Sequence, residues 1–157
     1  MADFDHDLYQ MITRTRQVII KARKTELKKY GVPAVYVAAL NVIVRLKKRA
    51  TPANISRALF LEPHSVSELL SKMEELGLIR RVKDLERKNY VRAELTEEGQ
   101  EKYKDSRNIE SIKDMMSVLN PEEKKQLWDL LSRIRNQALK QLGQDDKSIY
   151  PPSRPDE

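Results

Sequence analysis

One amphipathic segment bounded by turn residues most constrains the fold of this chain, and it begins at Pro63. Proline is well tolerated at the first helical position, because the N–H that it lacks has no partner there. Apolar residues then recur at helical spacing and form one stripe: Val66, Leu69, Leu70, Met73 and Leu76. Gly77 follows, and glycine suits the left-handed residue that ends a helix. The spacing therefore predicts a helix over residues 63–76 with one buried face.

The opposite face of this predicted helix is short-chained and rich in hydroxyl groups. Its candidate contact residues are His64, Ser65, Ser67, Glu68, Ser71 and Lys72. Short polar side chains let a helix approach the base edges in a major groove of DNA. Considered alone, such a face is more often a solvated surface, so the flanking elements decide between the two interpretations.

Short helices and strands flank the segment in a regular order. Thr51 followed by Pro52 is typical of a helix start, because threonine caps free N–H groups and proline fits the first turn. Residues 60–62 separate that helix from the next, and two short helices joined by a turn form a helix-turn-helix. Further on, the β-favouring runs 78–82 and 90–95 enclose a charged segment and predict a hairpin.

The predicted hairpin is strongly basic. Residues 78–92 contain six lysines and arginines against two acids, and Arg87 and Lys88 occupy the predicted tip. Cationic side chains of this kind bind phosphates by releasing counterions from DNA, and arginine can also enter a minor groove. The hairpin and the polar helix face together indicate a nucleic-acid-binding surface.

The stretch from residue 51 to residue 99 resembles the winged helix-turn-helix of the MarR family of transcriptional regulators. The more specific marks are Gly-Leu-Ile-Arg-Arg at 77–81 and Leu-Thr-Glu-Glu-Gly at 95–99, and the resemblance covers about residues 5–143. Family wings often read Asp-Pro-x-Asp-Arg-Arg, whereas here Leu85 replaces the proline. This departure leaves open which basic wing residue enters the minor groove.

The resemblance implies a mainly α fold with a small β-hairpin wing, completed by N- and C-terminal dimerisation helices. It implies a homodimer that binds double-stranded DNA and reads a pseudo-palindromic operator, with release by a small effector as a further property of the class. The expected regions are residues 1–32 and 97–143 for dimerisation, 33–96 for DNA binding and 144–157 as a mobile tail.

The remaining segments are expected to be helical. Residues 34–46 favour a strand by their valine and isoleucine content, but their length and central alanines favour a buried helix, and the resemblance supports the helix. One helix is expected from the Thr96 cap to about Val118, and another from the Asn120 cap to about Leu142. The long apolar stripe of the last helix suggests docking on a second copy.

Composition excludes several other classes. The 157 residues suggest one compact unit, the net charge of +6 favours an anionic partner, and the lack of cysteine excludes disulfides and thiolate metal sites. Two histidines far apart in the sequence, no phosphate-binding loop and no catalytic triad argue against a metal, a cofactor or an enzyme. No signal peptide and no apolar run of membrane length are visible, so we expect a soluble cytoplasmic protein without a membrane partner.

Two alternatives remain open at this stage. A winged helix can instead bind a protein partner without sequence-specific DNA binding, and it can serve as the dimerisation part of an enzyme, although no cofactor-binding domain is visible here. Trp128, Tyr36 and Tyr103 could line an effector cavity, but aromatic residues of this kind are more often core.

Overall fold

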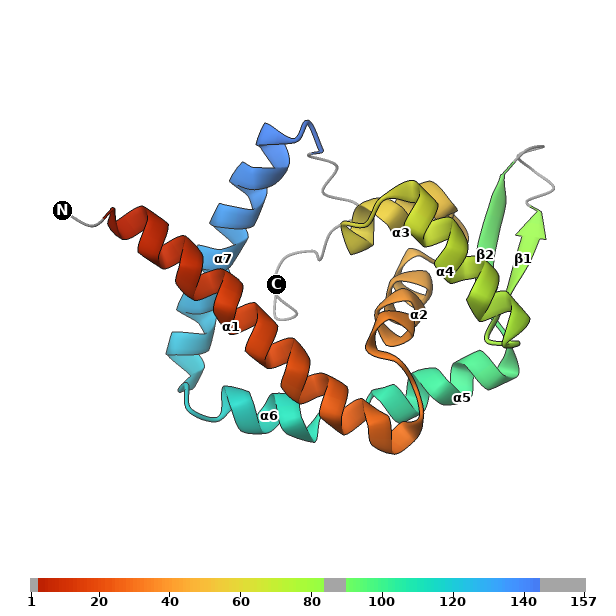
Figure 1. The fold of residues 1–157 in the computed structure, drawn as a ribbon, viewed down its shortest axis with the longest axis horizontal. Coiled ribbons are helices and arrows are strands. Elements are labelled where there is room, and N and C mark those ends of the chain that lie inside the picture. The colour runs from red at the N-terminus through yellow and green to blue at the C-terminus, as the bar shows by residue number, and fades with distance from the viewer. Residues whose placement is uncertain (1–2, 84–89, 145–157) are drawn as a thin grey trace.

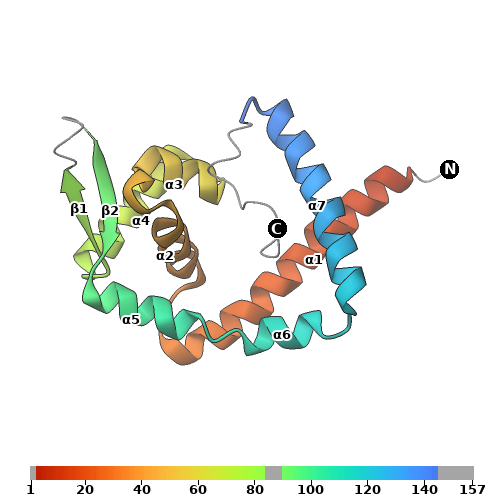
Figure 2. The same ribbon diagram turned by 180° about the vertical axis from the view of Figure 1, so that it is seen from behind.

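The computed structural model describes residues 3–83 and 90–144, and the chain forms two helical lobes (Figure 1). The first lobe comprises α2 (Ala34–Leu46), α3 (Pro52–Leu59), α4 (Pro63–Glu75), β1 (Ile79–Lys83) and β2 (Val91–Leu95). The second comprises α1 (Phe4–Leu27), α6 (Glu110–Met116) and α7 (Pro121–Gln141). Helix α5 (Glu97–Ser106) runs below α2 and leads from the hairpin to α6 (Figure 2). The predicted fold class, mainly α with a small β-hairpin wing, is confirmed.

The core of the first lobe forms around α2. This helix spans the valine-rich segment for which strand and helix were both considered, so the helical prediction is confirmed. Its buried residues Leu40 and Ile43 pack with Ile55 of α3 and with Leu70 and other residues of α4. Because side chains from three helices and the hairpin meet in one cluster, the orientation of α4 is fixed by apolar burial.

The hairpin is a two-stranded antiparallel sheet with Ile79 opposite Leu95 and Lys83 opposite Val91. A Cβ atom on Gly99 would lie 1.9 Å from the Leu78 carbonyl oxygen, so only glycine allows the first turn of α5 to approach the start of the hairpin this closely. Thr96 caps the same turn by accepting a hydrogen bond from the Gly99 N–H at 3.1 Å. These contacts explain why threonine at position 96 and glycine at position 99 suit the start of α5.

The single helix expected from Thr96 to Val118 is wrong, because α5 ends at Ser106 and α6 begins at Glu110. Arg23 of α1 donates hydrogen bonds to the carbonyl oxygens of Ser106 and Asn108, the latter at 2.7 Å. Glu26 of α1 accepts from the Ser111 N–H at 3.0 Å. These α1 side chains form hydrogen bonds with backbone carbonyl and N–H groups at the break. Those groups therefore do not need the partners that a continuous helix would supply.

The second lobe leaves much apolar surface exposed. On α7 only Leu139 is buried. The exposed large apolar residues of α1 and α7 are Phe4, Leu8, Tyr9, Met11, Val18, Leu127, Trp128, Leu130, Leu131 and Ile134.

Among the described residues, no single helix has the length and apolar composition of a membrane span. The segments Phe4–Tyr30 and Ala34–Arg49 have that length and composition only when taken together, and the chain bends by 88° between them. The tail predicted to be mobile lies, from residue 145 onwards, outside the described residues.

Candidate nucleic-acid interface

The turn between α3 and α4 is held by local hydrogen bonds. Thr51 caps α3 by accepting from the Asn54 N–H at 3.3 Å, and Pro52 occupies the first turn. Ser56, buried on α3, donates from Oγ to the Leu61 carbonyl oxygen at 2.7 Å. Phe60 adopts a left-handed backbone with φ of 55°, which reverses the chain before α4. The turn predicted at residues 60–62 is therefore present, and it fixes the angle at which α4 leaves α3.

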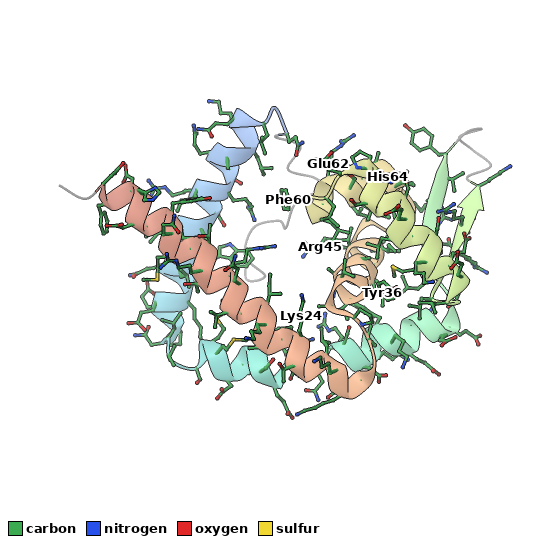
Figure 3. The ribbon with its side chains drawn as sticks, viewed as in Figure 1. Lys24, Tyr36, Arg45, Phe60, Glu62 and His64 are labelled. Carbon is green, nitrogen blue, oxygen red and sulfur yellow. The ribbon has the colours of Figure 1, made fainter. Side chains whose placement is uncertain are left out.

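The outer face of α4 presents the predicted contact residues. The exposed ones are His64, Ser65, Ser67, Glu68 and Lys72, whereas Ser71 is half-buried. Figure 3 shows Glu62 and His64 at the start of α4, with Phe60 in the turn before it. His64 Nε2 lies 3.2 Å from Glu68 Oε1. Both side chains are mostly exposed, so this pair contributes little to stability and can rearrange against a ligand.

The inner face of α4 is mostly buried as the stripe predicted, although Leu69 is only partly buried and Leu76 is exposed. Val66, Leu70 and Met73 are buried, but Leu76, expected to continue the stripe, is 48% exposed. Leu76 is the C-terminal cap of α4, where the chain already turns toward Gly77 with φ of 71°. The left-handed glycine predicted to end the helix is therefore confirmed, and its turn directs Leu76 away from the core.

Arg81 of the wing supports α4 from the side, a role that the sequence pattern did not reveal. Its Nη2 donates to Ser71 Oγ at 3.0 Å, and its backbone N–H donates to Glu74 Oε1 at 3.1 Å. Ser71 thus bonds to the wing in addition to lying on the candidate face. The sequence feature that could have predicted this contact is the short connection from α4 to β1, because it places the first strand beside the last turn of the helix.

A second arginine cluster lies at the base of the wing. Arg80 donates to Glu94 at 3.1 Å, and Arg92 also donates to Glu94. Hydrogen bonding from Arg92 lowers the pKa of Glu94 against the opposing effect of burial, and Arg80 lowers it further. Arg87 and Lys88, predicted at the tip of the wing, lie outside the described residues. Within the described part of the wing, the arginines of the candidate interface therefore lie at its base.

Other predicted site features are distributed through the structure. Tyr36 and Tyr103 pack against the core of the first lobe, whereas Trp128 is partly exposed on α7. Within residues 3–83 and 90–144, no group of three or more histidine, aspartate or glutamate residues could hold a metal ion. Lys47, Lys48 and Arg49 form a turn between α2 and α3, and the Ala50 carbonyl oxygen after it accepts from the Ala93 N–H of β2 at 2.9 Å. This basic turn lies beside the wing.

Comparison with known proteins identifies the same architecture. Residues 30–84 match the model of the MarR family. The ligand-free structure of the organohalide-sensing RdhR-CbdbA1625 transcriptional regulator is 30% identical over 98% of this chain and 90% of that one, with a TM-score of 0.77. Its 2,4-dichlorophenol-bound form is 33% identical over 88% of this chain and 83% of that one, with a TM-score of 0.75.

A further similar structure is a MarR/EmrR family transcriptional regulator from Acinetobacter sp. ADP1. It is 26% identical over 88% of this chain and 98% of that one, with a TM-score of 0.73. No curated protein gives a significant match to the chain. The structural matches extend well beyond residues 30–84 and include the helices on both sides of the wing.

Proposed function

The chain belongs to the MarR family of transcriptional regulators, and we propose that it acts as a homodimer that reads a pseudo-palindromic operator in double-stranded DNA. Each subunit places α4, the recognition helix, in a major groove and its wing beside it. A two-fold dimer presents two copies of the same helix, so it reads two related half-sites. Occupancy near a promoter then regulates transcription.

The observation that carries this proposal is the exposed polar face of α4 on a firmly packed helix. Val66, Leu70 and Met73 anchor the inner face in the core, and Arg81 holds the last turn from the wing. A recognition surface needs such support, because base readout depends on side chains held in a fixed geometry.

We assign the contacts on α4 by side-chain chemistry. Ser65 and Ser67 reach base edges, Glu68 accepts from a cytosine amino group, and His64 contacts a base or phosphate near the helix start. Lys72 contacts a phosphate, for which a point charge is sufficient. Ser71 contacts the DNA while its Oγ also accepts a hydrogen bond from Arg81.

At the predicted tip of the wing, we assign Arg87 to the minor groove and Lys88 to a phosphate. Arginine is the usual residue in narrow grooves, whereas lysine serves as a point charge for phosphate. Loss of Arg87 would therefore weaken A·T-rich sites selectively, and loss of Lys88 would change only the dependence on salt.

The dimer assignment rests on the second lobe. The apolar faces of α1 and α7 are exposed in one subunit, and large exposed apolar patches mark interaction surfaces. A second copy of the chain would bury them symmetrically. Residues 1–32 and 97–143 then form the dimerisation region, and residues 33–96 form the DNA-binding region.

We propose that a small effector releases the DNA, since the RdhR-CbdbA1625 regulator has been solved with 2,4-dichlorophenol bound. We propose further that the chain acts by binding and not by catalysis, and that it acts in the cytoplasm.

The experiment that tests this function is selection of genomic fragments by the purified full-length chain, followed by sequencing. Recovery of fragments that share an inverted repeat supports the proposal, with Ser67→Leu as the matched variant that loses the motif. Recovery of fragments without a shared sequence would favour the alternative of a winged-helix protein–protein module.

A further inference from the structure

A largely buried polar network joins the end of α1 to the break between α5 and α6. Its centre is Arg23 of α1, whose side chain is 14% exposed. Arg23 Nη1 donates to the Glu26 carboxylate and also to the Asn108 carbonyl oxygen, the latter at 2.7 Å. Its Nη2 donates to the carbonyl oxygen of Ser106, a buried residue at the end of α5. One guanidinium group therefore holds a carboxylate of its own helix and two carbonyl groups of the break.

Glu26 completes the network from the same helix. Its Oε1 accepts from the Ser111 N–H at 3.0 Å and its Oε2 from the Ser111 hydroxyl group, so it holds the first turn of α6. Beside it, the side-chain amide of Asn108 donates to the hydroxyl group of Tyr30. Burial raises the pKa of Glu26, but hydrogen bonds from Ser111 and Arg23 outweigh this effect and hold it at about 2, so the carboxylate is charged at neutral pH. A charged pair thus connects the end of α1, the end of α5 and the start of α6.

The connected segments belong to different parts of the molecule. Helix α5 is attached to the lobe that carries α4, because Gly99 lies against Leu78 and Tyr103 packs on the core of that lobe. Helix α6 leads to α7, which carries much of the exposed apolar face. Figures 1 and 2 both show the end of α1 beside the break between α5 and α6. The network therefore lies where one lobe is attached to the other.

The chemistry of the network favours one geometry at this attachment. A guanidinium group presents its donors in a rigid planar fork, and hydrogen bonds weaken when they are bent. The two terminal nitrogens of Arg23 bond the carbonyl oxygens of Ser106 and Asn108, which restricts the direction in which the chain leaves α5. Buried ion pairs return little net stability after desolvation, and in some proteins they select one conformation instead.

We propose that Arg23 and Glu26 are positioning residues that fix the separation of the two α4 helices in the dimer and thereby select the half-site spacing of the operator. This inference rests on the DNA-binding homodimer of the proposed function. One extra base pair between half-sites moves them apart by about 3.4 Å and turns them by about 35°. A recognition site must be held within about 0.5 Å and about 10–20° of its productive geometry. A rigid attachment therefore discriminates between spacings, whereas a loosened attachment accepts several.

Operator duplexes that differ only in the spacer test this selection. One selected operator is compared with duplexes whose spacer is one base pair shorter or longer. We expect the unmodified chain to bind the altered duplexes about tenfold more weakly, a loss comparable to that of one mismatched base pair. Arg23→Lys should reduce this discrimination to about threefold, because one lysine nitrogen replaces the two that bond the carbonyl groups. Arg16→Lys, the same change at an exposed position of α1, should keep the full discrimination.

Ser111→Ala is a milder variant that removes one hydroxyl contact with Glu26 and leaves the backbone bond in place. We expect it to lower the discrimination to about fivefold, as the loss of one hydrogen bond would. Ser117→Ala, at an exposed position after α6, is its control. Urea unfolding shows which variants are folded under the binding conditions. Affinity that fell by the same factor on every spacer would mean that the network only supports the fold, and it would overturn the proposal.

A measurement without DNA separates this proposal from the proposed function. The sequence contains no cysteine, so Glu75→Cys at the exposed end of α4 introduces one spin-label position in each subunit. Double electron–electron resonance between the two labels of a dimer should give one narrow distance distribution. Adding Arg23→Lys should broaden that distribution, and adding Arg16→Lys should not.

The label distances and the spacer series fail in different ways. An unchanged distribution with Arg23→Lys would overturn the positioning role, whatever the DNA affinities. A monomer, with no distance between labels, would overturn both the dimer and this inference. If the chain bound no operator at any spacing, the proposed function and the selection of spacing would fail together, while the label distances would still show whether Arg23 fixes the separation of the α4 helices.

Discussion

Arg81 on β1 donates a hydrogen bond from Nη2 to Oγ of Ser71 on α4 at 3.0 Å. The same arginine lies 3.6 Å from the Glu74 carboxylate. The wing and the recognition helix are thus joined by side chains as well as by the short chain between them. Arg81 therefore links the base of the wing to two residues of α4.

We expect Arg81→Ala to weaken operator binding more than it weakens the fold. The side chains of Arg81 and Glu74 are partly exposed, so the loss of their ion pair should lower the free energy of unfolding by only about 0.5 kcal/mol. A double-mutant cycle with Ser71→Ala in chemical denaturation measures the coupling, which should be of similar size. Strictly additive effects of the two changes would show that the bond does not join the wing to α4.

Replacing Ser67 by leucine should lower affinity for the operator about tenfold and change non-specific affinity little, because one lost base contact typically weakens binding by this amount. Ser117→Leu, an exposed serine after α6, is the matched control. Fluorescence anisotropy with operator and scrambled duplexes gives both affinities. A parallel loss on the two duplexes would mean that Ser67 contacts phosphate or supports the fold.

Glu26 makes stability depend on pH. Burial alone would raise its pKa, but hydrogen bonds from Ser111 and Arg23 outweigh this effect and lower the pKa from 4.5 to about 2. A folded-state pKa below the unfolded value stabilises the protein above pH 4.5, and this contribution is lost as the pH falls toward 2.

Glu26→Gln should therefore reduce the free energy of unfolding by up to about 3 kcal/mol at pH 7, and the difference from the wild type should shrink between pH 4.5 and 2. Urea unfolding at a series of pH values measures this difference, with Glu110→Gln on α6 as the control. A difference that stayed constant over that range would show that the charge of Glu26 is not the cause.

The exposed apolar faces of α1 and α7 predict a dimer at micromolar concentration. Leu130→Asp places a charge in the α7 face and should yield monomer or aggregate. Leu76→Asp alters a similarly exposed leucine on the other lobe and should remain dimeric. Light scattering of the three proteins decides between these outcomes, and a monodisperse monomer of the unmodified chain would contradict the dimer.

Much of the fold was predictable because it is encoded locally. Thr51, Pro63 and Gly77 set helix ends through their own backbone and side-chain properties. Residues 34–46 form the expected helix, but local propensity favoured a strand there and the family resemblance decided the prediction. The break after Ser106 was missed because the groups that satisfy it, on Arg23 and Glu26, lie more than 80 residues away. The spacing of apolar residues within one segment does not reveal a contact with a side chain so far away in the sequence.

The candidate site was predictable to a similar extent. Helical periodicity correctly placed His64, Ser67, Glu68 and Lys72 on the exposed face, since it depends only on spacing along α4. It did not reveal that Ser71 bonds to Arg81, because that contact depends on how the wing folds back on the helix. The roles of Arg87 and Lys88 remain predictions.

The most direct test of the central claim is equilibrium binding of the purified chain to one selected operator, to the same duplex with one half-site scrambled, and to the duplex with both scrambled. The homodimer account predicts the tightest binding to the intact site, at two chains per duplex. It predicts intermediate binding with one half-site and about a thousandfold weaker binding with none. Equal affinity for all three duplexes at physiological salt would contradict sequence-specific recognition by paired α4 helices.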